Sequence, residues 1–300
     1  MTDLVTAAVW NIDGDGGRNG ERRHLALDVL TEYEPDVFLQ QEAKFSRERG
    51  SELLHATEKR LSLRGFLSAP NPYVDADIAT AVYLRPTMFD FVEARRRAKP
   101  WWLHPCHVVA RLGTCPVPLN LISLHMCCFD ANQRLTEACW TAMHTGAVTL
   151  AAGDTNSYPR NPERLALPDW AAVTDRAHMV HRTYLDADGH RRSDTRPDAA
   201  LTDAGYLDLA RYAADHLGQP EALKATAGQC KPDQGGPQRI DRAYGTGGLA
   251  SALHSVDIVD NDDTREASDH SLLILRFYRV RLERVLTLPL AAAHTAEALR

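Results

Sequence analysis

The stretch VTLAAGDTN at residues 148–156 combines the pattern of a buried strand with a polar end. Its first five residues form an apolar, β-favouring run of the length of a buried strand. Asp154 and Asn156 follow the glycine and lie two residues apart, so in an extended chain their side chains point to the same side. The stretch predicts a carboxylate and a carboxamide at the end of a central strand, although Asp, Asn and Gly also form simple turns there.

The composition is that of an ordinary globular protein. The chain has 300 residues, 44% hydrophobic and 25% charged, which allows one large domain or two small ones with a sizeable core. The formal net charge of -6 excludes a broadly basic nucleic-acid binder, but it allows a local basic groove. No apolar run approaches the roughly 20 residues that span a bilayer.

The N-terminus and the cysteines both favour a cytoplasmic location. An acid at position 3 is followed at once by a strand-like segment, which does not resemble a secretory signal. The six cysteines include no Cys-x-x-Cys pair, which argues against a zinc site or a thioredoxin-like motif. We expect free thiols in a reducing cytosol, with the adjacent Cys127 and Cys128 serving as buried packing residues.

Alternating strand and helix patterns predict an α/β chain. Strands are expected at residues 5–12, 37–39, 78–84, 106–112, 119–124, 148–156, 239–244, 256–259 and 271–277. Helices are expected at residues 21–33, 46–61, 132–144 and 199–217. Residues 157–197 show neither period, so we expect a long loop inserted into one domain at residues 1–280, followed by a helical or loose C-terminal tail at 281–300.

Polar residues occur at one end of six of these strands. They are Asn11 and Asp13, Glu42, His125, Asp154 and Asn156, and Asp241 with Asp269 and His270. One such residue is usually a solvated strand end, but strand ends gathered at one edge of a sheet are where α/β proteins build sites. Carboxylates and amides without cysteine favour Mg²⁺ or Mn²⁺, and a histidine beside acids suits acid–base chemistry. The set predicts metal-assisted attack on a phosphate ester.

Six short motifs sharpen this prediction. They are Trp10-Asn11, Gln41-Glu42, Ser123-Leu124-His125, Gly153-Asp154-Thr155-Asn156, Arg239-Ile240-Asp241-Arg242 and Ser268-Asp269-His270. In these motifs and their order, residues 4–278 resemble the endonuclease/exonuclease/phosphatase family, which has the deoxyribonuclease-type fold. The resemblance implies a four-layer α/β sandwich, in which two mixed β-sheets pack face to face with helices outside.

The resemblance also implies a metal site. Glu42 and Asp269 would bind Mg²⁺ or Mn²⁺, with Asn11 and Asp13 nearby and partly acting through water. The number of metal ions, one or two, stays open at this point. A hard cation of this kind is consistent with the oxygen-rich residue set described above.

The same resemblance implies the catalytic and substrate-binding roles. His270 would act on the nucleophilic water or bind the phosphate, and Asp241 would orient it. Asp154 would contact the nucleophile or a second metal. Asn156 and His125 would donate hydrogen bonds to phosphoryl oxygens. No expected position is missing, which argues against a non-catalytic binding or scaffolding member of the family.

The motifs leave the substrate class open. Residues 10–14 and 41–44 resemble the abasic-site endonuclease branch, whereas His125 is typical of pancreatic-type deoxyribonucleases, sphingomyelinases and inositol-phosphate phosphatases. The leading interpretation is a metal-dependent phosphodiesterase or nuclease acting on DNA or RNA. The alternative is a phosphatase or phosphodiesterase for a small-molecule or lipid-headgroup phosphate. Endo or exo action and the oligomeric state stay open.

Three further features have two interpretations each. Residues 95–102 mix cations with two tryptophans, as a surface for single strands does, but tryptophans packed on the core explain the pattern more simply. The spacing of His178 and His181 fits a metal pair, but fits a surface helical turn better. Arginines of the insertion are expected to contact phosphates and influence substrate choice, unless they are merely solvated. They are Arg160, Arg164, Arg176, Arg182, Arg191 and Arg192.

Overall fold

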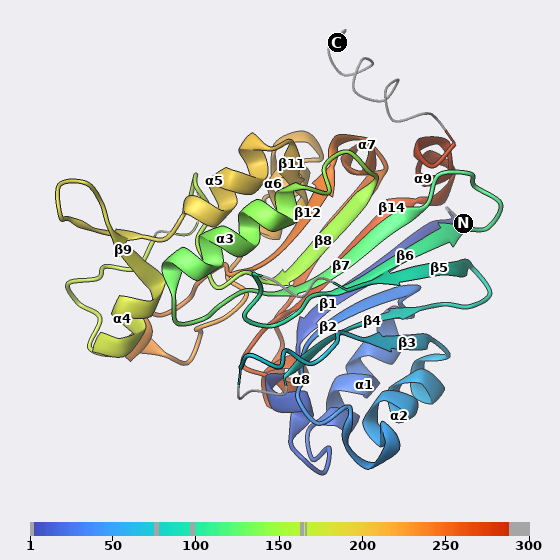
Figure 1. The fold of residues 1–300 in the computed structure, drawn as a ribbon, viewed down its shortest axis with the longest axis horizontal. Helices are drawn as coiled ribbons and strands as arrows, with labels where there is room; N and C mark the ends of the chain where they lie inside the picture. Colours follow the sequence, from blue (N-terminus) through green and yellow to red (C-terminus); the bar gives the residue numbers. More distant parts are fainter. Residues whose placement is uncertain (1–2, 75–77, 97–99, 163–164, 166, 288–300) are drawn as a thin grey trace, which may run out of the picture.

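Two six-stranded mixed sheets form the centre of the computed structural model, which describes residues 3–74, 78–96, 100–162, 165 and 167–287 (Figure 1). The first sheet, in its spatial order, contains β13 (Leu253–Val259), β14 (Leu272–Tyr278), β1 (Leu4–Asn11), β2 (Val37–Ala43), β4 (Ala79–Leu84) and β3 (Arg64–Leu67). The second contains β11 (Tyr206–Asp208), β12 (Asp241–Thr246), β8 (Thr149–Asp154), β7 (Leu119–His125), β6 (Cys106–Leu112) and β5 (Phe89–Arg95).

The described part of the chain also contains α-helices. They are α1 (Arg23–Tyr33), α2 (Glu52–Leu61), α3 (Ala131–Ala142), α4 (Arg176–Arg182), α5 (Arg196–Asp203), α6 (Leu209–His216), α7 (Gly247–Ser251), α8 (Asp262–Ala267) and α9 (Arg279–Val285). Helices α1 and α2 pack on the first sheet, and α3 and α5 on the second (Figure 1). In the described part of the chain, no helix has the length and apolar character needed to cross a membrane.

The period of two along β1 explains the layering. Ala7 and Val9 point to the inner face, where they join one apolar cluster with strands of the second sheet. Ala8 and Trp10 point to the outer face and pack under α1 and α2. Because both faces are buried, the strand is a continuous apolar run, and each fully buried aliphatic side chain contributes roughly 1.5–3 kcal/mol. The predicted four-layer sandwich is confirmed.

Strand direction brings the polar strand ends together. β1 and β2 are parallel, as are β7 and β8, so their carboxyl ends lie at one edge of each sheet. β14 and β12 run antiparallel to β1 and β8, so their amino ends reach the same edges. His125 is in register with Asp154, and Asp154 is in register with Asp241. Residues far apart in the sequence therefore become neighbours across three strands.

Gly153 lets the two sheets approach closely beside these strand ends. It has a φ of 144°, and an added Cβ would collide with the Leu124 carbonyl oxygen and lie 2.8 Å from Gln41 Nε2. In the space left by the missing side chain, Gln41 Nε2 donates to Ser123 Oγ at 2.9 Å. This bond joins β2 to β7, and therefore ties one sheet to the other. Glycine is required here both for its φ and for its size.

Several sequence predictions need correction. The helix expected at 199–217 is wrong, because α5 ends at Asp203 and β11 separates it from α6. The helix expected at 46–61 begins only at Glu52. The strands β3, β5 and β11 were not predicted. β5 is exposed at five of its seven positions and half-exposed at a sixth, as is common for an edge strand. The six cysteines are free, as expected, although their compartment stays a prediction.

The insertion is more regular than its composition indicated. It contains α4 and a two-stranded sheet of β9 (Thr183–Leu185) and β10 (Arg191–Ser193), so the prediction of a structureless loop is wrong. Arg134 of α3 anchors it: its Nη2 donates to Asp194 Oδ2 and to the His181 carbonyl, both at 2.9 Å. Its Nη1 donates to the Cys127 carbonyl at 2.6 Å. One buried guanidinium thus ties the insertion to the loop after His125.

Candidate active site

Asp154 is the centre of the site. Its carboxylate is 3% exposed, and its Oδ1 accepts the backbone N–H of Asn156 at 2.8 Å. Oδ2 accepts from Asn11 Nδ2 at 3.3 Å and lies 3.7 Å from His125 Nε2. The predicted neighbours from β1, β7 and β8 therefore meet at one carboxylate.

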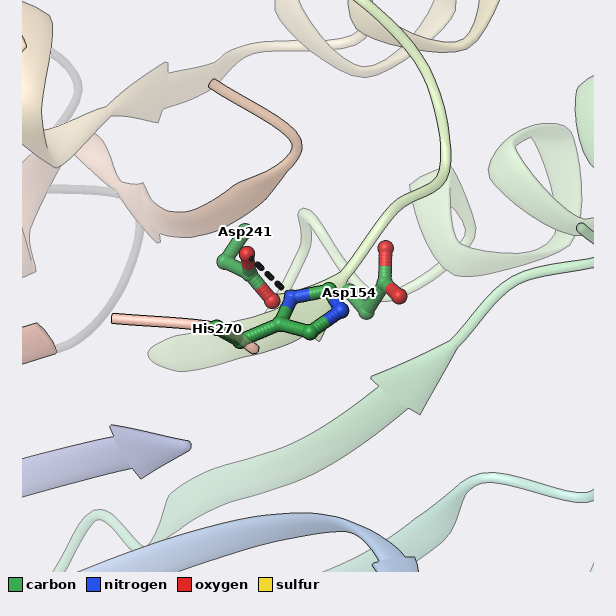
Figure 2. Close-up of side chains that lie close together, drawn as sticks. All are labelled: Asp154, Asp241 and His270. Carbon is green, nitrogen blue, oxygen red and sulfur yellow. Dashed lines mark hydrogen bonds and ion pairs between the residues drawn. The ribbon is translucent and has the colours of Figure 1, made fainter. Parts of the chain in front are cut away.

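His270 and Asp241 form the second part of the site (Figure 2). His270 Nδ1 and Asp241 Oδ2 are 2.8 Å apart, so one ring nitrogen is held and the other is left for chemistry. Asp154, Asp241 and His270 each offer one atom within 4.8 Å of the other two. The backbone N–H of Asp241 donates to Thr226 Oγ1 at 2.9 Å, which fixes the start of β12.

Electrostatics couple this pair. Burial opposes a charge on His270, but Asp241, Asp154 and Asp269 together raise its pKa to about 10. Burial raises the pKa of Asp241, while the His270 imidazolium acts in the opposite direction. The histidine is therefore held in its charged form at neutral pH in the metal-free protein. In this form it can donate a hydrogen bond to an anionic oxygen.

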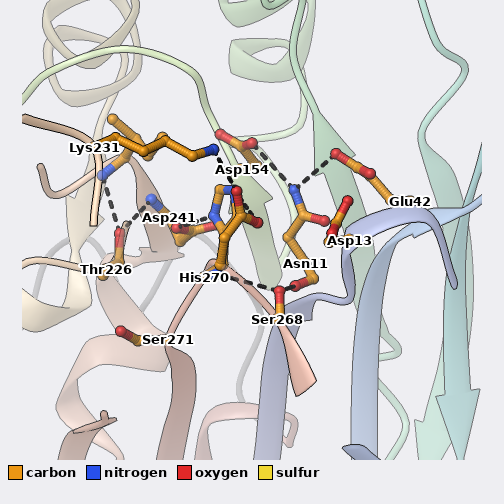
Figure 3. A network of polar contacts seen from close by, with 12 residues as sticks. Asn11, Asp13, Glu42, Asp154, Thr226, Lys231, Asp241, Ser268, His270 and Ser271 are labelled. Carbon is orange, nitrogen blue, oxygen red and sulfur yellow. Dashed lines mark hydrogen bonds and ion pairs between the residues drawn. The ribbon is translucent and has the colours of Figure 1, made fainter. Parts of the chain in front are cut away.

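Glu42 and Asn11 form the third part (Figure 3). Glu42 lies in a bulge of β2 with a φ of 55°, a left-handed conformation that is uncommon for this residue type. Its Oε2 accepts the backbone N–H of Gly14 at 2.8 Å, and its Oε1 accepts from Asn11 Nδ2 at 3.2 Å. A single amide group therefore bridges Glu42 and Asp154. Backbone strain of this kind is common where a side chain is aimed at a ligand.

The donor set fits a hard divalent cation. Asn11 Oδ1 and Asp241 Oδ1 are buried without a hydrogen-bond partner in the described part of the chain. Buried oxygens normally have a partner, so these two point to a cation or water. Within that same part, Glu42 belongs to no group of three or more His, Cys, Asp and Glu ligand atoms within 4.8 Å. A cation there would draw on Asn11 and on ligands from the substrate or water.

The other predicted residues have partners of their own. Asp13 accepts from Arg22 Nη2 at 2.9 Å. Asp269 lies 2.5 Å from Lys231 Nζ, and although burial opposes its charge, His270 and Lys231 lower its pKa. Asn156, at a φ of 50°, donates from Nδ2 to the Met126 carbonyl at 2.9 Å. That bond positions the loop after His125 and leaves Asn156 one N–H for a ligand.

Sequence reasoning did not assign to the site four residues that the structure places around it. Lys231 pairs with Asp269, and Cys128 lies close enough to Arg182 and Asp154 for both to influence its pKa, which burial raises. Glu137 of α3 accepts from the backbone N–H groups of Trp102 and Cys127 at 2.7 and 2.8 Å. Trp102 packs edge-on against His125. The sequence analysis considered Trp102 for single-strand binding or core packing and Cys128 for packing, and no local signal marks Glu137 or Lys231.

The arginines of the insertion differ from one another. Arg160 and Arg192 form ion pairs with Asp203 and Asp186, and Arg191 donates to Thr183 Oγ1. Arg164 lies outside the described residues, as do residues 97–99 of the basic segment. Arg182 is half-buried, with a buried Nη1 that has no partner in the described part of the chain.

Two alternative interpretations are also resolved. His178 and His181 lie on α4 and, within the described residues, belong to no metal-binding group, so the helical-turn interpretation is favoured. Burial and Arg182 lower the pKa of His178 to about 4. Trp101 is buried in an apolar cluster, and Trp102 is half-buried. Cys127 is buried as predicted, whereas Cys128 is only half-buried.

Comparisons with known proteins agree with this architecture. A family model described as "Endonuclease/Exonuclease/phosphatase family" matches residues 8–270. The fold is similar to that of D. rerio TDP2 complexed with single strand DNA product, with a TM-score of 0.59 and 17% identity, covering 92% of this chain and 99% of that one. No match was found among curated proteins.

Two further solved structures share the fold. An AP endonuclease from Archaeoglobus fulgidus has a TM-score of 0.59 and 14% identity, covering 91% of this chain and 99% of that one. The 3' phosphatase NExo from Neisseria, bound to product DNA hairpin, has a TM-score of 0.58 and 15% identity, with the same coverage. At these identities the likeness concerns the fold, whereas the family model extends over most of the chain and its motifs. The chain belongs to the endonuclease/exonuclease/phosphatase family.

Proposed function

We propose that the chain is a metal-dependent hydrolase of phosphodiesters, with nucleic acid as its substrate. The observation that carries the proposal is the buried Asp154 carboxylate, which lies between Asn11, His125 and the His270–Asp241 pair. Two buried oxygens of this group have no partner in the described part of the chain. Burying several charged side chains together costs desolvation free energy and does not stabilise the fold. Such a cluster is therefore typical of a catalytic site.

Each residue of the site has its own proposed role. Asp154 accepts the proton of the attacking water, because its buried carboxylate is an acceptor at the centre of the site. His270, held at Nδ1 by Asp241, donates to a phosphoryl oxygen through Nε2, and His125 and the remaining N–H of Asn156 donate to others. Glu42 and Asn11, together with oxygens of water or of the substrate, would hold Mg²⁺ or Mn²⁺, which when bound polarises the phosphoryl oxygen as a Lewis acid.

Nucleic acid is favoured as the substrate by two observations. The structures with this fold include one described as TDP2 with single strand DNA product and one described as a 3' phosphatase with a DNA hairpin. Lys231, Arg182 and His270 also place cations beside the carboxylates of the site, although Lys231 is paired with Asp269 and the chain as a whole carries a charge of -6. Such cations can form charge-assisted hydrogen bonds with phosphate oxygens.

A substrate panel tests the proposal. A labelled oligonucleotide and a small phosphate diester are assayed with Mg²⁺, with Mn²⁺ and with EDTA. We expect oligonucleotide cleavage that EDTA abolishes. We also expect the KM of the oligonucleotide to rise steeply between about 50 and 200 mM salt, because several phosphate contacts release counterions. Full activity after exhaustive chelation contradicts the metal requirement.

The second candidate is a hydrolase of small phosphate esters. His125 is compatible with it, since that residue is typical of sphingomyelinases and inositol-phosphate phosphatases as well as of pancreatic-type deoxyribonucleases. A pocket that binds one phosphate responds weakly to salt. Efficient turnover of the small ester, together with no oligonucleotide cleavage at low salt, would establish this alternative.

A further inference from the structure

A groove of about 450 Å³ lies beside the candidate site, outside its carboxylates. Its walls are largely aromatic and include Tyr73, Trp101, Trp102 and Phe129. None of these side chains takes part in the chemistry proposed above. The groove therefore calls for a function of its own.

One wall of the groove contacts the site. The ring of Trp102 lies 5.7 Å from that of His125 at 78°, and 5.2 Å from that of Phe129 at 83°. These are edge-to-face contacts of the usual spacing. His125 Nε2 in turn lies 3.7 Å from Asp154 Oδ2. Two side-chain contacts therefore connect the aromatic wall to the central carboxylate of the site.

The groove presents flat apolar surface to its contents. Tyr73 is 71% exposed and Phe129 is 49% exposed, which is a large exposure for two aromatic side chains that line the same groove. Exposed aromatic surface of this kind marks interaction sites. Every nucleobase has a flat π-face, so such walls accept bases with little regard to sequence.

Trp101 forms the floor of the groove. It is only 7% exposed and packs in a buried apolar cluster with Leu124 and Met126, next to the loop after His125. The floor of the groove is therefore part of the apolar core beneath the site.

The walls are held in place before any ligand binds. Glu137 accepts the backbone N–H groups of Trp102 and Cys127, at 2.7 and 2.8 Å. Asn71 Nδ2 donates to the carbonyl oxygens of Trp101 and Trp102, at 2.7 and 2.9 Å. A preformed groove loses little conformational entropy on binding.

We infer that this groove stacks an unpaired base of the nucleotide next to the cleaved phosphate. The inference rests on the proposed function, because it requires a nucleic-acid substrate. The base must be unpaired, since a base inside a duplex is already stacked and paired and cannot enter between the rings. The protein therefore prefers single-stranded ends, overhangs or loops at this position.

The test compares two single-stranded oligonucleotides, each with one natural phosphodiester among phosphorothioate linkages. They differ only in whether the nucleotide beside that phosphodiester carries a base or a tetrahydrofuran abasic analogue. Stacking of one base is expected to raise kcat/KM about 5- to 100-fold. Because the comparison is a ratio within one protein sample, partial misfolding of a variant does not affect it.

Three variants connect this preference to the groove. Phe129→Ala is expected to bring the ratio close to one, and Phe129→Tyr, which keeps the ring, to retain it. Trp140→Ala is the matched control, because it removes a 38% exposed aromatic side chain from the far end of α3. Its ratio should equal that of the wild type.

The outcomes separate the inference from the proposed function. A wild type that cleaves both oligonucleotides equally, or a Phe129→Ala variant that keeps the full preference, overturns the inference and leaves the proposed function intact. A wild type that cleaves neither oligonucleotide but hydrolyses the small diester overturns the proposed function, and the inference with it.

Discussion

Two groups of two aspartates and one histidine occur in the described part of the chain, and they differ in almost everything but composition. The first is Asp154, Asp241 and His270, and the second is Asp186, Asp188 and His190. In both groups, one ligand atom of each residue lies within 4.8 Å of the others. A search for metal-ligand types alone would rank them as equals.

Their surroundings distinguish them. The first group comes from β8 and β12 of the second sheet and from the segment just before β14 of the first, and it is largely buried, with Asp241 Oδ1 left without a partner in the described part of the chain. The second lies in one turn between β9 and β10 and is largely exposed. There Asp186 already accepts from Arg192 and from the backbone N–H groups of Asp188 and His190, and these bonds lower its pKa. Unsatisfied buried oxygens, rather than residue types, mark the site.

The largest effect is expected on kcat, from substitutions in the first group, and substitutions in the second group serve as controls. Asp154→Asn and His270→Ala should each lower kcat by roughly 10²-fold or more, as the loss of an acid–base group or an oxyanion donor does. Asp186→Asn and His190→Asn are matched controls and should remain close to the wild-type rate. Initial rates on one phosphodiester measure all four. Near wild-type activity in a folded Asp154→Asn variant would remove this residue from the mechanism.

A second effect concerns the metal. Glu42→Gln keeps the size of the side chain but removes the negative charge beside Asn11. Its affinity for Mn²⁺, measured by calorimetry without substrate, should fall by roughly the 10- to 100-fold that the loss of even an outer-shell partner costs. Asp188→Asn serves as the exposed counterpart. If it weakens Mn²⁺ binding more than Glu42→Gln does, the two groups have been assigned the wrong way round.

A smaller effect, on the KM of an oligonucleotide, is expected in the insertion, where two arginines can be compared. Arg182 has a buried Nη1 without a partner in the described part of the chain, whereas Arg192 is paired with Asp186. Arg182→Ala should raise the KM of an oligonucleotide roughly tenfold, the scale of one hydrogen bond to a charged group. Arg192→Ala should change it little. Equal effects would indicate that the insertion acts through its fold.

The same contrast explains what the sequence could predict. Asn11, Glu42, His125, Asp154 and Asp241 each end or begin an apolar run, and both the run and its polar end are local features. Strand direction then brings them together. The prediction of two mixed sheets and of the residues gathered at their edge therefore needed only local patterns and the family resemblance.

The remainder depends on contacts between distant segments. β5 is an edge strand with exposed positions, so it lacks the apolar run that marks the buried strands. The helix expected at 199–217 is interrupted because Tyr206 pairs with Thr246 of β12, a contact that no local pattern reports. Arg134 and Glu137 act on loops far from them in the sequence, by hydrogen bonds to backbone groups. Such roles leave no signal in a helix pattern.

Glu137 adds a third case to the comparison of the two groups, because it is a buried carboxylate whose oxygens have hydrogen-bond partners. Both accept hydrogen bonds, from the N–H groups of Trp102 and Cys127 and from Gln133 Nε2. Burial nevertheless raises its pKa to about 7, against the opposing effect of those donors. If an unsatisfied oxygen marks catalysis, Glu137 should influence stability and its pH dependence rather than the chemical step.

The smallest expected effect follows from the sign of that shift. A carboxyl group whose pKa is raised on folding stabilises the protein fully below about pH 4.5, and this contribution is lost as the pH rises through 7. Residue 137 does not titrate in the Glu137→Gln variant. The free energy of unfolding of this variant, relative to that of the wild type, should therefore increase as the pH rises. The gain should be at most about 1.4 kcal/mol per pH unit. Denaturant unfolding of both proteins at pH 5, 6.5 and 8 measures it. A difference that stays constant from pH 5 to pH 8 would mean that the three donors outweigh burial and hold Glu137 as a carboxylate throughout, like the satisfied Asp186 of the exposed group.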